Sequence, residues 1–200
     1  MTARHIVFDI GNVLVRWHPA AAWAEELPAD ADLADFMTRT DFAARNLRAD
    51  GGTPFADLAA EIADPDDRAL LAAYPARFGR TVRDPITGSW DILDALRARG
   101  LGIHAITNWS AETWPAGLVA HPRLGSAFDT LVVSGHEGLI KPDPAIFRLF
   151  LTRAGLDATD CLFIDDSIAN VAGARAVGMD AIHFTGPDAL AAELADRGLL

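Results

Sequence analysis

Two acidic segments hold the residues of this chain that are best suited to chemistry. Asp9 follows the apolar run 5–8, and the pair Asp165-Asp166 follows the apolar run 161–164. Runs rich in β-branched and aromatic residues predict buried strands, and open α/β sheets bind ligands at the carboxyl ends of their strands. Carboxylates delivered by two strands to one edge form a site for a hard cation such as Mg²⁺. One of these carboxylates can also act as a nucleophile.

Helices and strands alternate from residue 84 onward, and this alternation positions the acidic segments. Asp84-Pro85 and Asp143-Pro144 each predict a helix start, with an aspartate N-cap before a proline at the first helical position. The pattern predicts an α/β fold, a Rossmann-like parallel sheet with right-handed crossovers and helices on both faces. Beside the strand at 5–8, strands are expected at 103–107, 130–134, 161–164 and 181–184.

Residues 16–83 interrupt this alternation, and they contain no convincing strand. Asp50-Gly51-Gly52 is a turn signal within this segment. We therefore expect an α/β core domain from residues 1–15 and 84–200, and a small helical cap domain from residues 16–83 inserted after the first strand. Helices are expected in the cap at 19–27, 30–48, 53–62 and 66–78.

The composition limits the kinds of molecule that the protein is expected to bind. The chain has 200 residues, half of them hydrophobic, which suffices for one domain with a modest insertion. A formal net charge of -11 disfavours nucleic acid and anionic membranes as partners. No apolar stretch approaches the ~18 residues of a membrane span, and the first residues lack a signal-peptide pattern. We expect a cytoplasmic protein with a small-molecule substrate, whose oligomeric state the sequence does not reveal.

Four segments fall at the predicted carboxyl ends of strands. Each segment alone is a weak signal of function, but the four in this order form a specific signature. They are 9–13 (Asp-Ile-Gly-Asn-Val), Thr107-Asn108, Lys141-Pro142-Asp143 and Asp165-Asp166. With a helical insertion after the first segment, this set resembles the haloacid dehalogenase-like (HAD) hydrolase superfamily. The first segment is most similar to a capped branch that includes sugar-phosphate phosphatases.

The resemblance implies a Mg²⁺-dependent phosphatase of a small phosphorylated metabolite, such as a sugar phosphate. Asp9 would be the nucleophile and would form an aspartyl-phosphate. The metal ion would be held by Asp9, by the backbone carbonyl of Gly11 and by Asp166, with Asp165 as a second ligand or a holder of water.

The same resemblance implies the residues that bind the substrate. Lys141 would neutralise the nucleophile and the phosphate together, while Thr107 and Asn108 would hold the phosphoryl oxygens. Specificity in such capped hydrolases lies in the insertion. The candidates for contacts with the rest of the substrate are Trp17 and His18 at the hinge, and Arg45, Asn46 and Arg48 in the cap.

One position departs from the usual pattern of these phosphatases and keeps two alternatives open. Most of them carry a second Asp two residues after the nucleophile as general acid and base, but Gly11 stands there in this chain. Water, a cap residue or the substrate could supply the proton instead. The alternatives are a 2-haloacid dehalogenase, which needs no metal, and a non-catalytic HAD-fold binding or regulatory protein. Asp165-Asp166 favours the phosphatase, because adjacent unpaired carboxylates are costly without a cation.

Overall fold

Five parallel strands form a single sheet at the centre of the computed structural model, which describes residues 3–200. The strand order is β3-β2-β1-β4-β5, so the first strand of the chain lies in the middle. Phe8 of β1 pairs with Ala105 of β2 on one side and with Ile164 of β4 on the other. The strands are β1 (His5–Phe8), β2 (Gly102–Thr107), β3 (Thr130–Val133), β4 (Cys161–Asp165) and β5 (Asp180–His183).

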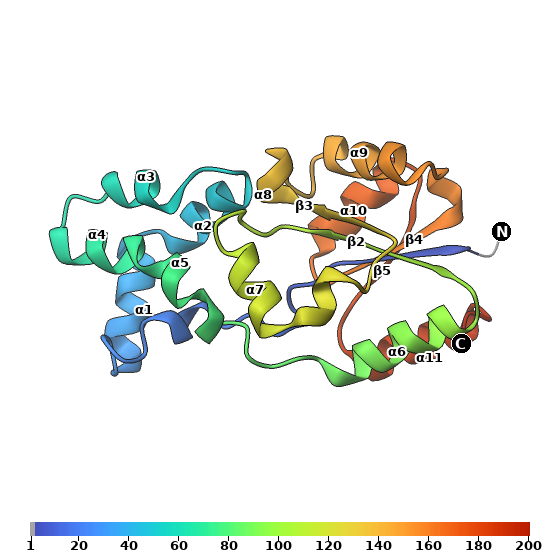
Figure 1. Cartoon of the computed structure of the whole chain (residues 1–200), viewed down its shortest axis with the longest axis horizontal. Helices are drawn as coiled ribbons and strands as arrows, with labels where there is room; N and C mark the ends of the chain where they lie inside the picture. The colour runs from blue at the N-terminus through green and yellow to red at the C-terminus, as the bar shows by residue number, and fades with distance from the viewer. Residues whose placement is uncertain (1–2) are drawn as a thin grey trace.

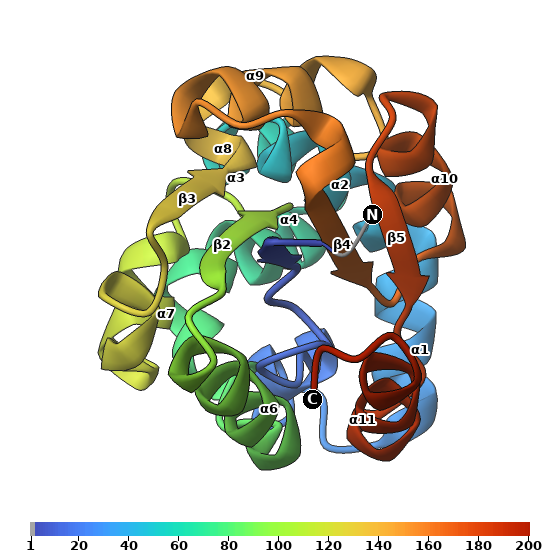
Figure 2. The ribbon, with the colours of Figure 1, turned by 90° about the vertical axis from the view of Figure 1, so that its right-hand side faces the viewer.

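Helices cover both faces of the sheet, as the continuous apolar strands require. Ile6 and Phe8 pack in one cluster with residues of α6 and α11, whereas Val7 packs in a second cluster with α9 and α10. Figure 2 shows α9 and α10 above the sheet and α6 and α11 below it. These helices are α6 (Thr87–Ala98), α9 (Pro144–Ala154), α10 (Ile168–Ala176) and α11 (Pro187–Asp196). The predicted α/β fold with helices on both faces is confirmed.

The shorter elements connect the strands. They are α7 (Trp114–Ala120), α8 (Ser134–Glu137) and the 3₁₀ helices η3 (Pro122–Gly125) and η4 (Ala158–Asp160). Among residues 3–200, no helix combines the length and the apolar character needed to cross a membrane.

A helical segment between β1 and α6 lies beyond one end of the sheet (Figure 1). Its core is aromatic: Trp23 stacks on Tyr74 at 5.1 Å between ring centroids, and Phe42 contacts both rings edge-on at 5.1 Å. All three side chains are buried. The segment contains η1 (Pro19–Ala22), α1 (Asp30–Arg39), α2 (Phe42–Asp50), α3 (Phe55–Ala60), α4 (Pro65–Ala72), α5 (Tyr74–Arg77) and η2 (Phe78–Arg80).

Four predicted helices differ from those observed. The helix expected at 19–27 is only the 3₁₀ helix η1, and the helix expected at 66–78 is divided among α4, α5 and η2. α6 begins at Thr87 and not at Pro85, because Pro85 forms a β-bridge with Val15 and the Ile86 N–H donates to Leu14 O at 2.8 Å. The helix expected at 30–48 is two helices, because Asp41 has a left-handed backbone with φ of 44° between α1 and α2. The N-cap predicted at Asp143 is confirmed, since its side chain accepts the Ala145 N–H at 2.8 Å.

Candidate active site

Three carboxylates meet at the carboxyl edge of the sheet because β1 and β4 are neighbours. Asp9 follows β1, Asp165 ends β4, and Asp166 is the next residue. The Asp9 N–H donates to Ile164 O at 2.8 Å, which fixes the end of β1 against β4. One oxygen from each of the three carboxylates lies within 4.8 Å of the others. Such a cluster of oxygen donors fits a hard divalent cation.

Lys141 binds two of these carboxylates from within the protein. Its Nζ donates to Asp9 Oδ1 at 2.8 Å, to Asp165 Oδ2 at 2.7 Å and to Ile106 O at 2.9 Å, so all three N–H donors have acceptors. The residue is 1% exposed. Burial by itself lowers the pKa of Lys141, but the charges of Asp165 and Asp9 raise it above its ordinary value. Lys141 is therefore a fixed buried cation between two carboxylates.

The two carboxylate oxygens of Asp9 differ, because only one of them accepts hydrogen bonds from the described residues. Oδ1 accepts the Ile10 N–H at 2.7 Å as well as the Lys141 ammonium. Oδ2 has no hydrogen bond within residues 3–200, so it is the oxygen available for attack. Burial raises the pKa of Asp9 to about 7; Lys141 opposes this shift, and the negative charge of Asp165 adds to it. A divalent cation beside Asp9 would favour the ionised carboxylate.

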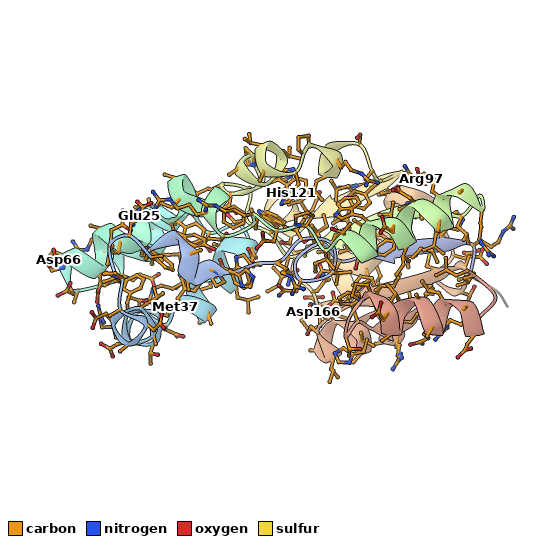
Figure 3. All side chains as sticks on the ribbon, turned by 90° about the horizontal axis from the view of Figure 1, so that it is seen from below. Glu25, Met37, Asp66, Arg97, His121 and Asp166 are labelled. Atoms are coloured by element: carbon orange, nitrogen blue, oxygen red, sulfur yellow. The ribbon has the colours of Figure 1, made fainter. Side chains whose placement is uncertain are left out.

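The adjacent residues Asp165 and Asp166 lie in different environments. Asp165 is fully buried, and its oxygens accept the Ser167 N–H at 2.8 Å and the Asn170 amide at 3.0 and 3.1 Å, besides Lys141. Asp166 is partly exposed, and burial together with the charge of Asp165 raises its pKa. It lies at the junction between the helical segment and the α/β core (Figure 3). Asp166 thus faces the site, whereas Asp165 holds Lys141 and the following loop.

Thr107, the last residue of β2, and Asn108, which follows it, are the predicted phosphate-binding pair. The Asn108 side chain donates to Lys141 O at 3.0 Å and accepts the Lys141 N–H at 2.8 Å, so it fixes the backbone that carries the lysine. One N–H of the Asn108 amide remains for a ligand. The Thr107 hydroxyl is buried and has no hydrogen-bond partner within residues 3–200.

A cavity of about 160 Å³ lies between the helical segment and the sheet edge. Its polar lining comes from both parts of the chain. Core residues in it are Asp9, Gly11, Asn12, Asn108 and Asp166, and α2 contributes Asn46 and Asp50. The remaining lining is Val15, Trp17, Phe78, Val82, Trp109 and Thr113. The cavity therefore combines the reactive carboxylates with apolar and aromatic side chains from both parts of the chain.

The structure brings two of the five candidate substrate residues to this cavity. Trp17 and Asn46 line it, whereas His18, Arg45 and Arg48 do not. Arg48 makes a bidentate ion pair with Glu61, both contacts being 2.7 Å.

The rotation of α2 about its own axis explains why Asn46 lines the cavity and Arg45 and Arg48 do not. Positions 45 and 48 share the helix face that turns toward Glu61, with Arg45 Nη2 3.7 Å from Glu61 Oε2 and other guanidinium contacts to Thr40 O and Leu58 O. Positions 46 and 50, four residues apart, share the face that turns to the cavity.

Several residues that line the cavity were not predicted from the sequence. Asp50 was read only as part of a turn, although its spacing from Asn46 was a signal for a shared helix face. Trp109, which is not among the predicted site residues, lines the cavity and packs edge-on against Trp114 at 5.2 Å. No pattern in the sequence indicated that Phe78 and Val82 would complete this wall.

Comparisons with known proteins match this chain to one family of hydrolases. The family model for haloacid dehalogenase-like hydrolase matches residues 3–178. The chain is 26% identical to the sesquiterpene phosphatase AstK of Aspergillus oryzae over 193 residues, which is 96% of this chain and 95% of that protein. It is 29% identical to the phosphoglycolate phosphatase of Pseudomonas putida over 135 residues, which is 68% of this chain but only 48% of that protein. It is 32% identical to flavin mononucleotide hydrolase 1 of Arabidopsis thaliana over 57% of this chain and 46% of that protein.

Solved structures share the fold at low sequence identity. The magnesium complex of the HAD family enzyme BT-2542 from Bacteroides thetaiotaomicron gives a TM-score of 0.72 at 20% identity, covering 93% of this chain and 95% of that one. The L-2-haloacid dehalogenase of Xanthobacter autotrophicus, with chloropropionic acid covalently bound, gives a TM-score of 0.65 at 18% identity, covering 99% of this chain and 84% of that one. Identities this low show a common fold and not a common substrate.

Proposed function

The chain belongs to the haloacid dehalogenase-like hydrolases, and on that premise we propose that it is a Mg²⁺-dependent phosphomonoesterase of small phosphorylated metabolites. The observation that carries this proposal is the cluster of Asp9, Asp165 and Asp166 around the buried Lys141, at the wall of a cavity. Relatives named as phosphatases support the same reaction class.

Asp9 Oδ2 would attack the phosphorus atom of the ester. The bond between phosphorus and the alcohol oxygen breaks, which leaves a phosphoryl group on Asp9, and water then releases inorganic phosphate. Asp9, Asp166 and the Gly11 carbonyl would hold Mg²⁺, which neutralises negative charge on the phosphoryl group when bound. Asp165 supports this site through Lys141, because its oxygens already accept several protein hydrogen bonds.

The end of β2 would bind the phosphoryl oxygens. The buried Thr107 hydroxyl lacks a partner among the described residues, and a phosphoryl oxygen would satisfy it. The free N–H of Asn108 would donate to the same group. Lys141 would offset the charge of Asp9 as the anionic ester approaches.

A requirement for metal would distinguish this function from the dehalogenase alternative, which needs no metal. The glycine at position 11 favours that alternative. We expect a chelator to abolish phosphate release from a panel of phosphate monoesters, and Mg²⁺ to restore it. Asp166→Ala should raise the Mg²⁺ concentration required for half-maximal activity by at least ~10-fold, because a metal ligand is lost.

Asp188→Ala provides the control, since Asp188 is an exposed aspartate in the first turn of α11 and does not line the cavity. Full activity in excess chelator, accompanied by halide release from 2-chloropropionate, would favour a dehalogenase. No turnover of either substrate class would favour a binding protein.

We propose further that residues 16–83 act as a cap that selects the substrate and excludes water as it closes. Trp17 lies in the cavity wall, and its indole N–H donates to the Tyr74 hydroxyl at 3.1 Å. Trp17→Ala is therefore expected to change the order of preferred substrates in the panel and to raise KM for the best one by ~10-fold, because apolar contact area is lost.

Arg48→Ala is the matched control in the same segment. Arg48 forms an exposed ion pair with Glu61 away from the cavity, and such pairs contribute only about 0–1 kcal/mol to stability. If Arg48→Ala reorders the panel and Trp17→Ala does not, specificity lies on the outer face of α2.

A further inference from the structure

The cavity lacks an acidic side chain at the position where related phosphatases place their general acid. Gly11 lines the cavity, and a Cβ atom built on it meets nothing within 4 Å. The alcohol of a phosphate ester is a poor leaving group unless its oxygen receives a proton. Water, the substrate or another group at the cavity must therefore supply that proton.

Asp50 is a carboxylate that the helical segment contributes to the same cavity. It is the last residue of α2 and is 8% exposed. Its Oδ2 accepts the Asn46 amide at 3.0 Å, and Asn46 also lines the cavity. Its backbone carbonyl accepts the Ser134 hydroxyl at 2.6 Å, and Ser134 Oγ accepts the Trp109 N–H at 2.9 Å. The α/β core thus fixes the end of α2 that carries this carboxylate.

No cation pairs with Asp50 within residues 3–200, in contrast to Asp67 of the same helical segment. Asp67 is equally buried, but it receives two hydrogen bonds from Arg39, each 2.7 Å long. A buried carboxylate without a counterion favours its neutral, protonated form. Burial raises the pKa of Asp50 to about 8; the Ser110 amide opposes this shift, the charge of Asp9 adds to it, and Lys141 lowers it. A protonated carboxyl group at a cavity wall can donate its proton.

We propose that Asp50 is the general acid and base of this site, supplied by the helical segment in place of an aspartate at position 11. This role holds only if the protein is the phosphatase proposed above. In the first step, Asp50 gives its proton to the ester oxygen as Asp9 Oδ2 bonds to phosphorus and the P–O bond of the ester breaks, which releases the alcohol. In the second step, Asp50 takes a proton from water as the water oxygen bonds to phosphorus and the bond to Asp9 breaks, which releases phosphate.

Two esters of similar size test this assignment. p-Nitrophenolate leaves without a proton near neutral pH, whereas the alkoxide of benzyl phosphate does not. In Asp50→Asn, the ratio of kcat/KM for p-nitrophenyl phosphate to kcat/KM for benzyl phosphate should rise by at least ~10²-fold, which is the lower end of typical acid–base contributions. The comparison uses kcat/KM because it reports the step that releases the alcohol, whereas hydrolysis of the phosphoryl-enzyme is common to both esters. Asp67→Asn is the control: it loses a buried carboxylate charge in the same segment, and its ratio should match that of the parent.

Rescue adds a second readout that a structural role for Asp50 would not produce. Gly11→Asp in the Asp50→Asn background should recover at least ~10-fold of the lost benzyl phosphate activity, because the space beside Gly11 is open. If Asp50→Asn does not fold, Asn46→Ala should shift the ratio in the same direction by a smaller factor, since it removes the hydrogen bond that orients the carboxyl group.

An unchanged ratio in folded Asp50→Asn, or an equal loss on both esters without rescue, would overturn the role of Asp50 and leave the phosphatase proposal intact. An unchanged ratio in Asn46→Ala would do the same where only that variant folds. Absence of Mg²⁺-dependent hydrolysis of either ester by the parent protein would overturn both.

Discussion

Asp9→Asn is expected to lower phosphatase kcat by at least ~10³-fold, about 4 kcal/mol of activation free energy, while the protein stays folded. An amide does not attack phosphorus as a carboxylate does, so the phosphoryl-enzyme cannot form. The shape of the side chain is preserved, and Lys141 keeps its contacts with Asp165 Oδ2 at 2.7 Å and Ile106 O at 2.9 Å. The fold therefore retains most of the interactions at this edge of the sheet.

Phosphate release and thermal unfolding, measured on the same preparation, check this expectation. Asp67→Asn again serves as the control, because it removes a buried carboxylate charge outside the cavity. Near-normal turnover in folded Asp9→Asn would show that another group is the nucleophile.

The sheet and its acidic edge could be predicted because their signals are local. The apolar runs before Asp9 and Asp165 define β1 and β4, and adjacent parallel strands bring their carboxyl ends together. The motif around Lys141 lies in a connection that returns to this edge, where the lysine reaches both carboxylates. Strand periodicity therefore sufficed to place the acidic segments at one edge of the sheet, whereas Lys141 was indicated only by the resemblance to the HAD hydrolases.

The residues that line the cavity could not be predicted in the same way. Which residues line it depends on which face of α2 is turned inward and on packing between segments that are distant in the sequence. A single helix at 30–48 was expected, but the left-handed Asp41 starts a new helix with its own orientation. That orientation turns Asn46 and Asp50 to the cavity and turns Arg48 to Glu61. The backbone angle of one residue thus decides which side chains of α2 can meet a substrate.

Lys141 is the other residue whose loss should have a large effect. It is the only lysine among the 17 Lys and Arg residues of the chain. An ammonium group is compact and directs three donors at separate acceptors, whereas a guanidinium is a planar fork suited to bidentate pairs. The acceptors around Nζ are two carboxylates and a backbone carbonyl, so the site matches the ammonium geometry.

Lys141→Met is expected to lower kcat/KM by ~10³-fold, because a buried cation beside the nucleophile has no substitute in this site. Without it, the pKa of Asp9 should rise above its already elevated value, since the opposing effect of Lys141 is lost and burial continues to favour the neutral acid. A neutral Asp9 is not a nucleophile, so activity at neutral pH should fall most at low Mg²⁺ concentration, where no cation favours the ionised carboxylate.

Lys141→Arg distinguishes loss of charge from loss of geometry. It keeps the positive charge, so it should preserve stability better than Lys141→Met, in which two buried carboxylates lose their cation at a cost of about 3–5 kcal/mol in the free energy of unfolding. Its kcat/KM should still be well below that of the parent, because the planar group cannot make the same three contacts. A kcat/KM equal to that of the parent in folded Lys141→Met would mean that the charge between Asp9 and Asp165 stabilises the fold and takes no part in the reaction.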